Sequence, residues 1–144
     1  MKKILISGVF DLLHSSHILM FRSVKMFGDY LVVNIIPDNR VREKKGEGRP
    51  IQSELEREFV IKHLITLVDE TTCIEAKKDQ TQDEYEETLL RQIAPSVFIR
   101  GKPSTYIEKF CKKHHIRFIV FPEVNGIDKM HTTDIINKIK KSCK

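Results

Sequence analysis

The feature that most constrains the fold of this chain is a regular alternation of short apolar runs with longer amphipathic ones. The short runs are rich in β-branched and aromatic residues, which predicts buried strands, at residues 3–10, 30–37, 71–76, 96–101 and 117–123. The longer runs repeat apolar residues at helical spacing, at residues 17–27, 53–67, 82–94, 104–115 and 132–144. Strands separated by helices predict an α/β fold: one Rossmann-like domain, residues 1–144, with a five-stranded parallel sheet and helices on both faces.

Two local signals refine this pattern. Ser53 followed by Glu56 is a capping box, so we expect a helix to begin there. Residues 38–51, DNRVREKKGEGRPI, are highly charged and contain glycines, which is typical of a mobile surface loop. The sequence therefore predicts a flexible basic segment directly after the second strand.

Composition excludes several classes of protein. The formal net charge is +5, but lysines and acids are interspersed, so no nucleic-acid binding is expected. No apolar run approaches the ~20 residues that span a bilayer, and the first strand is too short for a signal peptide, so no membrane association is expected. The three cysteines are widely spaced, with no CxxC pair, which suits a reducing compartment. We therefore expect a cytoplasmic protein.

Chemically useful side chains gather where the predicted strands end. Parallel sheets of this kind bind ligands at the carboxyl ends of their strands, near the point where the strand order reverses. The residues there are glycines, histidines, hydroxyl residues and charged residues, among them Gly8, Val9, Phe10, Asp11, His14, His17, Asp38, Lys44, Lys45, Arg100, Gly101, Lys102, Thr132 and Thr133. Cations and helix N-termini both favour negative charge, so we expect this edge of the sheet to bind phosphates.

The pair His14 and His17, within the sequence HSSH, is the sharpest of these features. A spacing of three residues serves metal ligation, phosphate binding and plain helix packing, so the pair alone leaves all three open. A metal site would need a third protein ligand, and none stands at a recognisable spacing. We therefore expect no metal site made by the protein itself.

Residues 8–38 resemble the signature of the cytidylyltransferase-like nucleotidyltransferases, which carry a GxFD turn followed by an HxGH motif. The likeness continues in GEGRPIQSELERE, in VDE and in HTTDIINKI, so it runs over residues 3–139. The resemblance implies an enzyme in which a phosphate-bearing acceptor attacks the α-phosphate of a nucleoside triphosphate and releases pyrophosphate. It also implies Mg²⁺ as the cofactor that accompanies the triphosphate, and a homodimer.

The resemblance assigns roles to residues of this chain. His14 and His17 would donate hydrogen bonds to the triphosphate in the transition state. Lys44 or Lys45 would clamp the phosphates, and Arg57 would complete this charge cradle. The implied nucleotide-binding residues are Gly8, Val9, Phe10, Asp11, Ser16, Arg100, Gly101, Thr132 and Thr133, of which the two threonines would hold the β and γ phosphates. The implied acceptor-binding residues are Asp11, Asp38 and Lys102.

The substrates stay open between two branches of this family. HTTDIINKI is similar to the cytidylyltransferases that act on glycerol 3-phosphate or phosphoethanolamine. That likeness favours transfer of CMP from CTP to a small phosphorylated polyol or alcohol. KKGEGRPI is more similar to the adenylyltransferases that act on heptose 1-phosphate, which favours ATP and a sugar 1-phosphate.

Two departures from the family pattern support a hypothesis of another class, a catalytically weak nucleotide-binding regulatory module. Ser16 stands where the HxGH motif has glycine, and residues 122–130, PEVNGIDKM, lack the arginine that many cytidylyltransferases carry there. A third departure concerns the acceptor, because Lys102 stands where relatives often have glycine or an acid.

Ser16→Gly tests the first departure. If the serine hydroxyl binds phosphate, its removal lowers kcat by the worth of one charge-assisted hydrogen bond, ~1.5–3 kcal/mol. If the side chain only crowds the ligand, glycine leaves the rate unchanged or raises it. We expect an active enzyme in which Ser16→Gly changes kcat by less than about tenfold, measured by pyrophosphate release. A wild-type protein that binds nucleotide without turnover, beside a glycine variant that turns over, would instead support the regulatory module.

Overall fold

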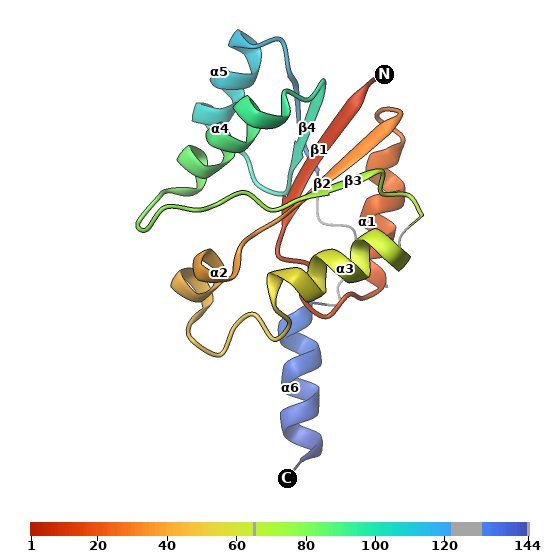
Figure 1. Ribbon diagram of the computed structural model, residues 1–144, viewed down its shortest axis with the longest axis vertical. Coiled ribbons are helices and arrows are strands. Elements are labelled where there is room, and N and C mark those ends of the chain that lie inside the picture. Colours follow the sequence, from red (N-terminus) through yellow and green to blue (C-terminus); the bar gives the residue numbers. More distant parts are fainter. Residues whose placement is uncertain (65, 122–130, 144) are drawn as a thin grey trace.

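Five parallel strands form the centre of the protein, in the order β3–β2–β1–β4–β5 (Figure 1). The computed structural model describes residues 1–64, 66–121 and 131–143. The strands are β1 (Lys3–Gly8), β2 (Tyr30–Ile35), β3 (Glu70–Thr72), β4 (Val97–Arg100) and β5 (Arg117–Val120). The chain winds outward from β1 to β3 and then returns to pair β4 with the other side of β1. The predicted five-stranded parallel sheet is confirmed.

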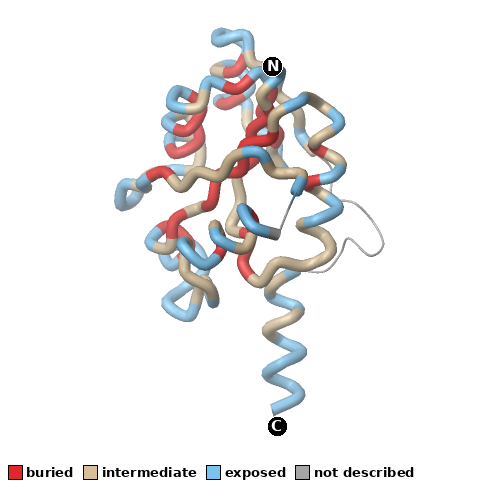
Figure 2. Tube along the Cα trace, turned by 45° about the vertical axis from the view of Figure 1, so that its right-hand side comes forward, coloured by how far each residue is buried: buried red, intermediate tan, exposed pale blue. Residues whose placement is uncertain are grey.

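Helices cover both faces of this sheet, as predicted (Figure 1). On one face α1 (Ser15–Lys25) and α3 (Glu54–Leu64) bury Phe21 and Ile61 against Ile4 and Ile6 of β1. On the other face α4 (Gln82–Ile93) and α5 (Thr105–Lys113) pack on alternate strand residues, beginning with Leu5. Figure 2 shows the buried residues concentrated along the strands between these helices. Burial of each large apolar side chain stabilises the fold by ~1.5–3 kcal/mol.

The segment after β2 is a helix, α2 (Asp38–Lys45), so the prediction of a loop from residue 38 was wrong. The charges that suggested a loop stand where a helix favours them, with Asp38 in the first turn and lysines in the last. Pro37 precedes the helix, and Gly46 ends it with a φ of 93°. Because Val41 is buried, this highly charged helix is held against the body of the protein. The rest of the predicted loop, residues 46–51, does lack regular structure.

The capping box predicted before α3 is present. The Ser53 hydroxyl accepts a hydrogen bond of 3.3 Å from the backbone N–H of Glu56. In return, the Glu56 carboxylate accepts the backbone N–H of Ser53 at 2.8 Å. These two bonds satisfy backbone donors that the first turn of a helix leaves free, which is why α3 begins directly after Ser53.

The last described helix, α6 (Thr132–Ser142), extends away from the sheet (Figures 1 and 2), and none of its residues is buried. Its first residue is anchored, because the Thr132 hydroxyl donates a hydrogen bond of 2.6 Å to the backbone oxygen of Asp11. The N-terminus of α6 therefore meets the turn that follows β1. None of the described helices is long and apolar enough to cross a membrane. The altered segment PEVNGIDKM, residues 122–130, lies outside the described residues.

Candidate active site

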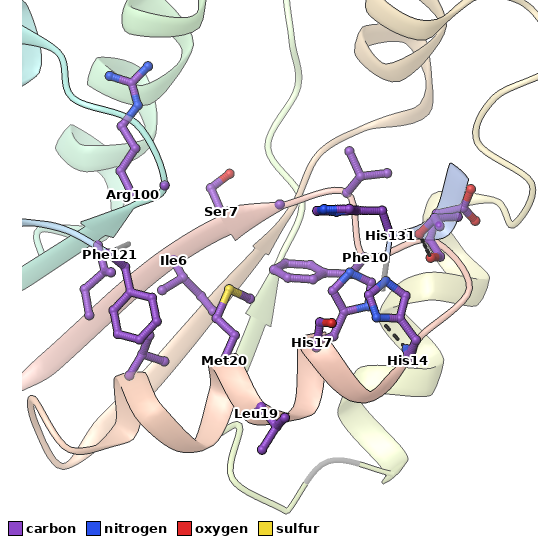
Figure 3. Close-up of a pocket in the computed structure, with 18 of the residues that line it drawn as sticks. Ile6, Ser7, Phe10, His14, His17, Leu19, Met20, Arg100, Phe121 and His131 are labelled. Carbon is purple, nitrogen blue, oxygen red and sulfur yellow. Dashed lines mark hydrogen bonds between the residues drawn. The ribbon is translucent and has the colours of Figure 1, made fainter. Parts of the chain in front are cut away.

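A cavity of about 520 Å³ lies at the carboxyl ends of β1 and β4, on the two sides of the point where the strand order reverses. Figure 3 shows His14, His17 and His131 at one end of it and Arg100 at the other. The cavity brings together most of the predicted site residues, namely Gly8, Val9, Phe10, Asp11, His14, Ser16, His17, Lys45, Arg100, Gly101, Thr132 and Thr133. Four predicted residues stand outside its lining: Asp38, Lys44, Arg57 and Lys102.

The turn after β1 is shaped by the close approach of Gly8 and Phe10. A Cβ atom added to Gly8 would lie 2.6 Å from the Phe10 ring, so this position requires glycine. Phe10 has a φ of 52°, a conformation that is uncommon for a residue with a side chain. Its ring then packs on Phe21 and meets His17 edge-on, with 5.4 Å between the ring centroids. The turn therefore sets the position of one of the two histidines.

The histidine pair stands at the N-terminus of α1, with His14 as the N-cap residue. The two rings stack, with 3.8 Å between their centroids and 23° between their planes. The backbone N–H of His14 donates a long hydrogen bond of 3.4 Å to Nδ1 of His17 (Figure 3). Because Nδ1 of His17 accepts this bond, the proton of the neutral ring lies on Nε2. His17 therefore offers its side-chain Nε2–H as a donor, in addition to its backbone N–H.

The N-terminus of α6 forms a second donor group in the cavity. Thr132 and Thr133 line the wall there, and His131 precedes them as the N-cap residue. The hydroxyl of Thr132 is bound to the backbone of Asp11, so its contribution to a ligand rests with the backbone N–H groups of the helix end. His131 was not among the predicted site residues, although it directly precedes the two threonines in HTTD.

The carboxylate of Asp11 holds the basic loop rather than facing the cavity freely. It is almost fully buried and accepts the backbone N–H groups of Ile51 and Gln52 at 2.8 and 3.0 Å. It also lies 3.6 Å from Nε of Arg49. The Nε and Nη2 atoms of Arg49 are buried without a hydrogen-bond partner, and Arg49 lines the cavity. A guanidinium in this state is suited to an anionic ligand, so Arg49 is a site residue that the sequence analysis did not single out.

The structure corrects the role predicted for Arg57. Its side chain is completely buried, outside the cavity lining. The guanidinium donates to the backbone oxygens of Val9 and Gln52 at 2.6 and 3.1 Å, and to the Asp38 carboxylate at 2.6 Å. Its donors are thereby directed at the protein, and Arg57 supports the walls of the cavity instead of a phosphate. The same ion pair engages the carboxylate of Asp38, which the resemblance assigns to acceptor binding.

The two lysines at the end of α2 differ in position. Lys45 lines the cavity, where burial and the nearby Arg49 lower its pKa. The ammonium of Lys44 instead donates a hydrogen bond to the side-chain oxygen of Gln82 on α4. Of the two lysines left open by the sequence, Lys45 is the one that lines the cavity. Lys102 is exposed on the loop after β4 and does not line the cavity.

Comparison with known proteins identifies the family. Residues 5–138 match the model of the family described as cytidylyltransferase-like. The chain belongs to the cytidylyltransferase-like family. This cytidylyltransferase-like domain is a nucleotidyltransferase.

Relatives of known sequence include the bifunctional protein HldE of Campylobacter fetus subsp. fetus (strain 82-40). It is 30% identical over 139 residues, which cover 93% of this chain and 27% of that protein. The bifunctional protein HldE of Desulfatibacillum aliphaticivorans is 33% identical over 143 residues, which cover 96% of this chain and 27% of that protein. The cytidylyltransferase-like chain thus spans little more than a quarter of the length of these relatives.

Solved structures share the fold. The lipopolysaccharide core biosynthesis protein from Thermoplasma volcanium has a TM-score of 0.68 at 23% identity, over 87% of this chain and 99% of that one. Pantothenate synthetase from Thermus thermophilus has a TM-score of 0.66 at 12% identity, over 98% of this chain and 64% of that one. At these identities the likeness shows a common fold for the cytidylyltransferase-like domain.

Both histidines of this cytidylyltransferase-like domain are uncharged near neutral pH. Burial, and secondarily the neighbouring His14, lowers the pKa of His17 from its ordinary value of 6.5 to about 4. Burial also lowers the pKa of His14, followed by the effect of His131. The pair therefore offers N–H groups rather than positive charges to a ligand, while Lys45 and Arg49 supply the charge.

These low pKa values predict a loss of stability in mild acid. Between pH 6.5 and pH 4 an unfolded His17 takes up a proton that the folded one does not, so the free energy of unfolding decreases as the pH falls through this range. His17→Gln removes that proton uptake, and urea unfolding at several pH values should show a shallower decrease than in the wild type. His63→Gln, at an exposed position on α3, is the matched control and should follow the wild type. Equal slopes for wild type and His17→Gln would contradict the buried, neutral histidine.

Proposed function

We propose that this enzyme transfers AMP from ATP to a sugar 1-phosphate of the heptose type, with release of pyrophosphate. The observation that carries the proposal is the pair of uncharged histidines at the N-terminus of α1, set in one cavity with Lys45, Arg49 and the N-terminus of α6. These groups are donors and cations, which is what a triphosphate requires.

In the proposed reaction an oxygen of the acceptor's phosphate forms a bond to the α-phosphorus of the triphosphate. The bond from the α-phosphorus to the oxygen that bridges it to the β-phosphorus breaks, and pyrophosphate leaves. The acceptor phosphate is already ionised near neutral pH, so no residue has to remove a proton. The protein must hold the reactants in line and stabilise negative charge on the phosphoryl oxygens. N–H donors of His14 and His17 that are already oriented are suited to that second task.

Two observations support ATP and a sugar 1-phosphate over CTP and glycerol 3-phosphate. The relatives are bifunctional HldE proteins, which support the adenylyltransferase alternative on heptose 1-phosphate and give no support for CMP or glycerol phosphate. The loop sequence KKGEGRPI has the same likeness. We therefore favour the adenylyltransferase function over the cytidylyltransferase function that HTTDIINKI alone would suggest.

We also propose that Mg²⁺ enters with the triphosphate. The described residues contain no group of three or more His, Cys, Asp or Glu side chains that could hold a metal ion. Asp11, the carboxylate in the cavity wall, is engaged by backbone N–H groups. A triphosphate brings its own oxygen ligands for Mg²⁺, and the ion would neutralise part of the ligand's charge.

The cytoplasm is the compartment that we propose for the enzyme. The thiols of Cys73, Cys111 and Cys143 are free in the structure. Burial raises the pKa of Cys73 and of Cys111 to about 11, so neither forms a reactive thiolate readily. Such cysteines suit a reducing compartment.

The histidine pair provides the test of this function. Pyrophosphate release is measured with ATP or CTP, each paired with heptose 1-phosphate or glycerol 3-phosphate, and we expect turnover with ATP and heptose 1-phosphate. In that assay His14→Ala or His17→Ala should lower kcat by about 10²–10³, the usual effect of losing one preorganised donor. ATP affinity should change much less, because the donors act on charge that develops in the transition state.

His63→Ala is the control, because this exposed histidine of α3 lies outside the cavity lining. Full activity of either active-site variant would contradict the role of the pair. Turnover only with CTP and glycerol 3-phosphate would restore the other branch of the family. Nucleotide binding without turnover of any acceptor would favour the regulatory module.

We further propose a homodimer that forms through α3. Ile51 lies just before α3, and Leu55 and Phe59 are spaced four residues apart on it, which places these two on one side of the helix. The three residues are 53%, 74% and 62% exposed, values that are unusual for large apolar side chains. Exposed apolar residues that lie together are typical of protein–protein contacts.

The double variant Leu55→Ser/Phe59→Ser tests this interface. In sedimentation velocity at micromolar concentration, we expect the wild type to sediment as a dimer and the double variant as a monomer. Tyr106→Ser is the matched control, since Tyr106 is 51% exposed on α5, which covers the opposite face of the sheet. A monomeric wild type, or a double variant that stays dimeric, would refute the proposed contact.

A further inference from the structure

Glu86 is a buried carboxylate that the proposed reaction does not use. It lies on α4, is only 3% exposed, and does not belong to the cavity lining. Burial raises its pKa, while its hydrogen bond from Gln82 and the nearby Arg100 and Lys44 oppose that shift. A buried charge is costly unless it is paired, so its partners indicate what it is there to hold.

The first partner of Glu86 is Arg100, at the end of β4. The Oε2 atom of Glu86 lies 3.3 Å from Nε of Arg100, in an ion pair that lacks the alignment of a hydrogen bond. Asp83, one turn earlier on α4, accepts a hydrogen bond of 3.2 Å from Nη1 of the same guanidinium. Arg100 lines the cavity, at the end away from the histidines (Figure 3). Two carboxylates of α4 therefore hold the guanidinium of Arg100, a residue of the cavity lining.

The second partner of Glu86 is Gln82, which connects it to α2. The side-chain N–H of Gln82 donates to Oε1 of Glu86 at 2.6 Å. The oxygen of the same amide accepts from Nη2 of Arg40 at 3.0 Å and from the ammonium of Lys44. Arg40 and Lys44 stand one turn apart on α2, directly before Lys45 of the cavity wall. The amide thus joins the cationic side of α2 to the carboxylate of Glu86.

Lys44 is bound by a neutral amide at a point where an acid could have stood. A carboxylate at position 82 would form an ion pair with Lys44 and compete with a phosphate for it. With Gln82 the ammonium keeps its attraction for an anion while its position is fixed. Three cations and two carboxylates meet in this network, which leaves it with a net positive charge beside the cavity.

We propose that Glu86 is a positioning residue for phosphate binding. It holds the side chain of Arg100, a residue of the cavity lining, and, through Gln82 and Lys44, it holds α2, whose last residue Lys45 lines the same cavity. Cations from two different elements are thereby oriented by one buried carboxylate. The inference rests on the proposed function in that it takes the cavity to bind phosphates, and its test measures the binding of an inorganic polyphosphate, which requires no turnover.

The test is a pair of double-mutant cycles on the full chain. Calorimetric titration with inorganic tripolyphosphate gives Kd for Glu86→Gln, Arg100→Gln, Lys44→Gln and the two double variants that contain Glu86→Gln. We expect Glu86→Gln to raise Kd by about tenfold, and its effect to fall at least threefold in the Arg100→Gln and Lys44→Gln backgrounds, because residues in one network are not additive. Glu87→Gln is the matched control, because it removes the same charge one residue further along α4. The Glu87 carboxylate forms its ion pair with the exposed Arg91.

Gln82→Met gives a second measurement that leaves Glu86 in place. Its effect on Kd should be coupled more strongly to Lys44→Gln than to Arg100→Gln, because Gln82 contacts Lys44 directly. Additive effects throughout, or a Glu86→Gln variant that loses thermal stability while its Kd stays at the wild-type value, would overturn the proposal and show a structural role alone. A coupled change in Kd without turnover of any substrate would leave the positioning role standing and refute the proposed function. Turnover with additive effects would do the reverse.

Discussion

The buried guanidinium of Arg57 joins three segments on which the whole cavity depends. It binds the backbone oxygen of Val9 in the turn after β1, the backbone oxygen of Gln52 before α3, and the carboxylate of Asp38 at the start of α2. Asp11 reinforces the arrangement from the other side by accepting the N–H groups of Ile51 and Gln52. Loss of one partner of such a buried pair would leave an uncompensated charge at a cost of ~3–5 kcal/mol. Buried charged side chains therefore hold together the segments at this edge of the sheet.

Most of the fold could be predicted because apolar periodicity reports burial directly. β1, β2 and β4 lie inside the sheet, and their continuous apolar runs were recognisable. Helix α2 was missed because its only buried residues are Arg40 and Val41, amid charges that resemble a solvated loop. A helix held by one apolar residue and by hydrogen bonds to other elements has no periodic signal for sequence reasoning to detect.

The residues that line the site were harder to predict, because the type of a residue does not reveal which groups it forms hydrogen bonds with. Asp11, Asp38 and Arg57 stand in the segments that resemble the family, and all three were expected to bind substrate or phosphate. In the structure the Asp11 carboxylate accepts the backbone N–H groups of residues 51 and 52, and the side chains of Asp38 and Arg57 bind each other. Arg49 and His131 were not among the predicted site residues, although both line the cavity. Arg49 has buried N–H groups without a hydrogen-bond partner, and His131 is the N-cap residue of α6. The distinction depends on distances that only the folded chain defines. A buried N–H group without a hydrogen-bond partner, as at Nη2 of Arg49, is the most direct sign of a ligand contact.

The two stacked imidazoles also oppose the uptake of protons at this end of the cavity. With 3.8 Å between the ring centroids, a proton on one ring raises the cost of a proton on the other. Burial and, after it, a charge on His14 both disfavour protonation of His17 and lower its pKa. The electrostatic potential that meets an incoming anion is in this way buffered against mild acidification of its surroundings.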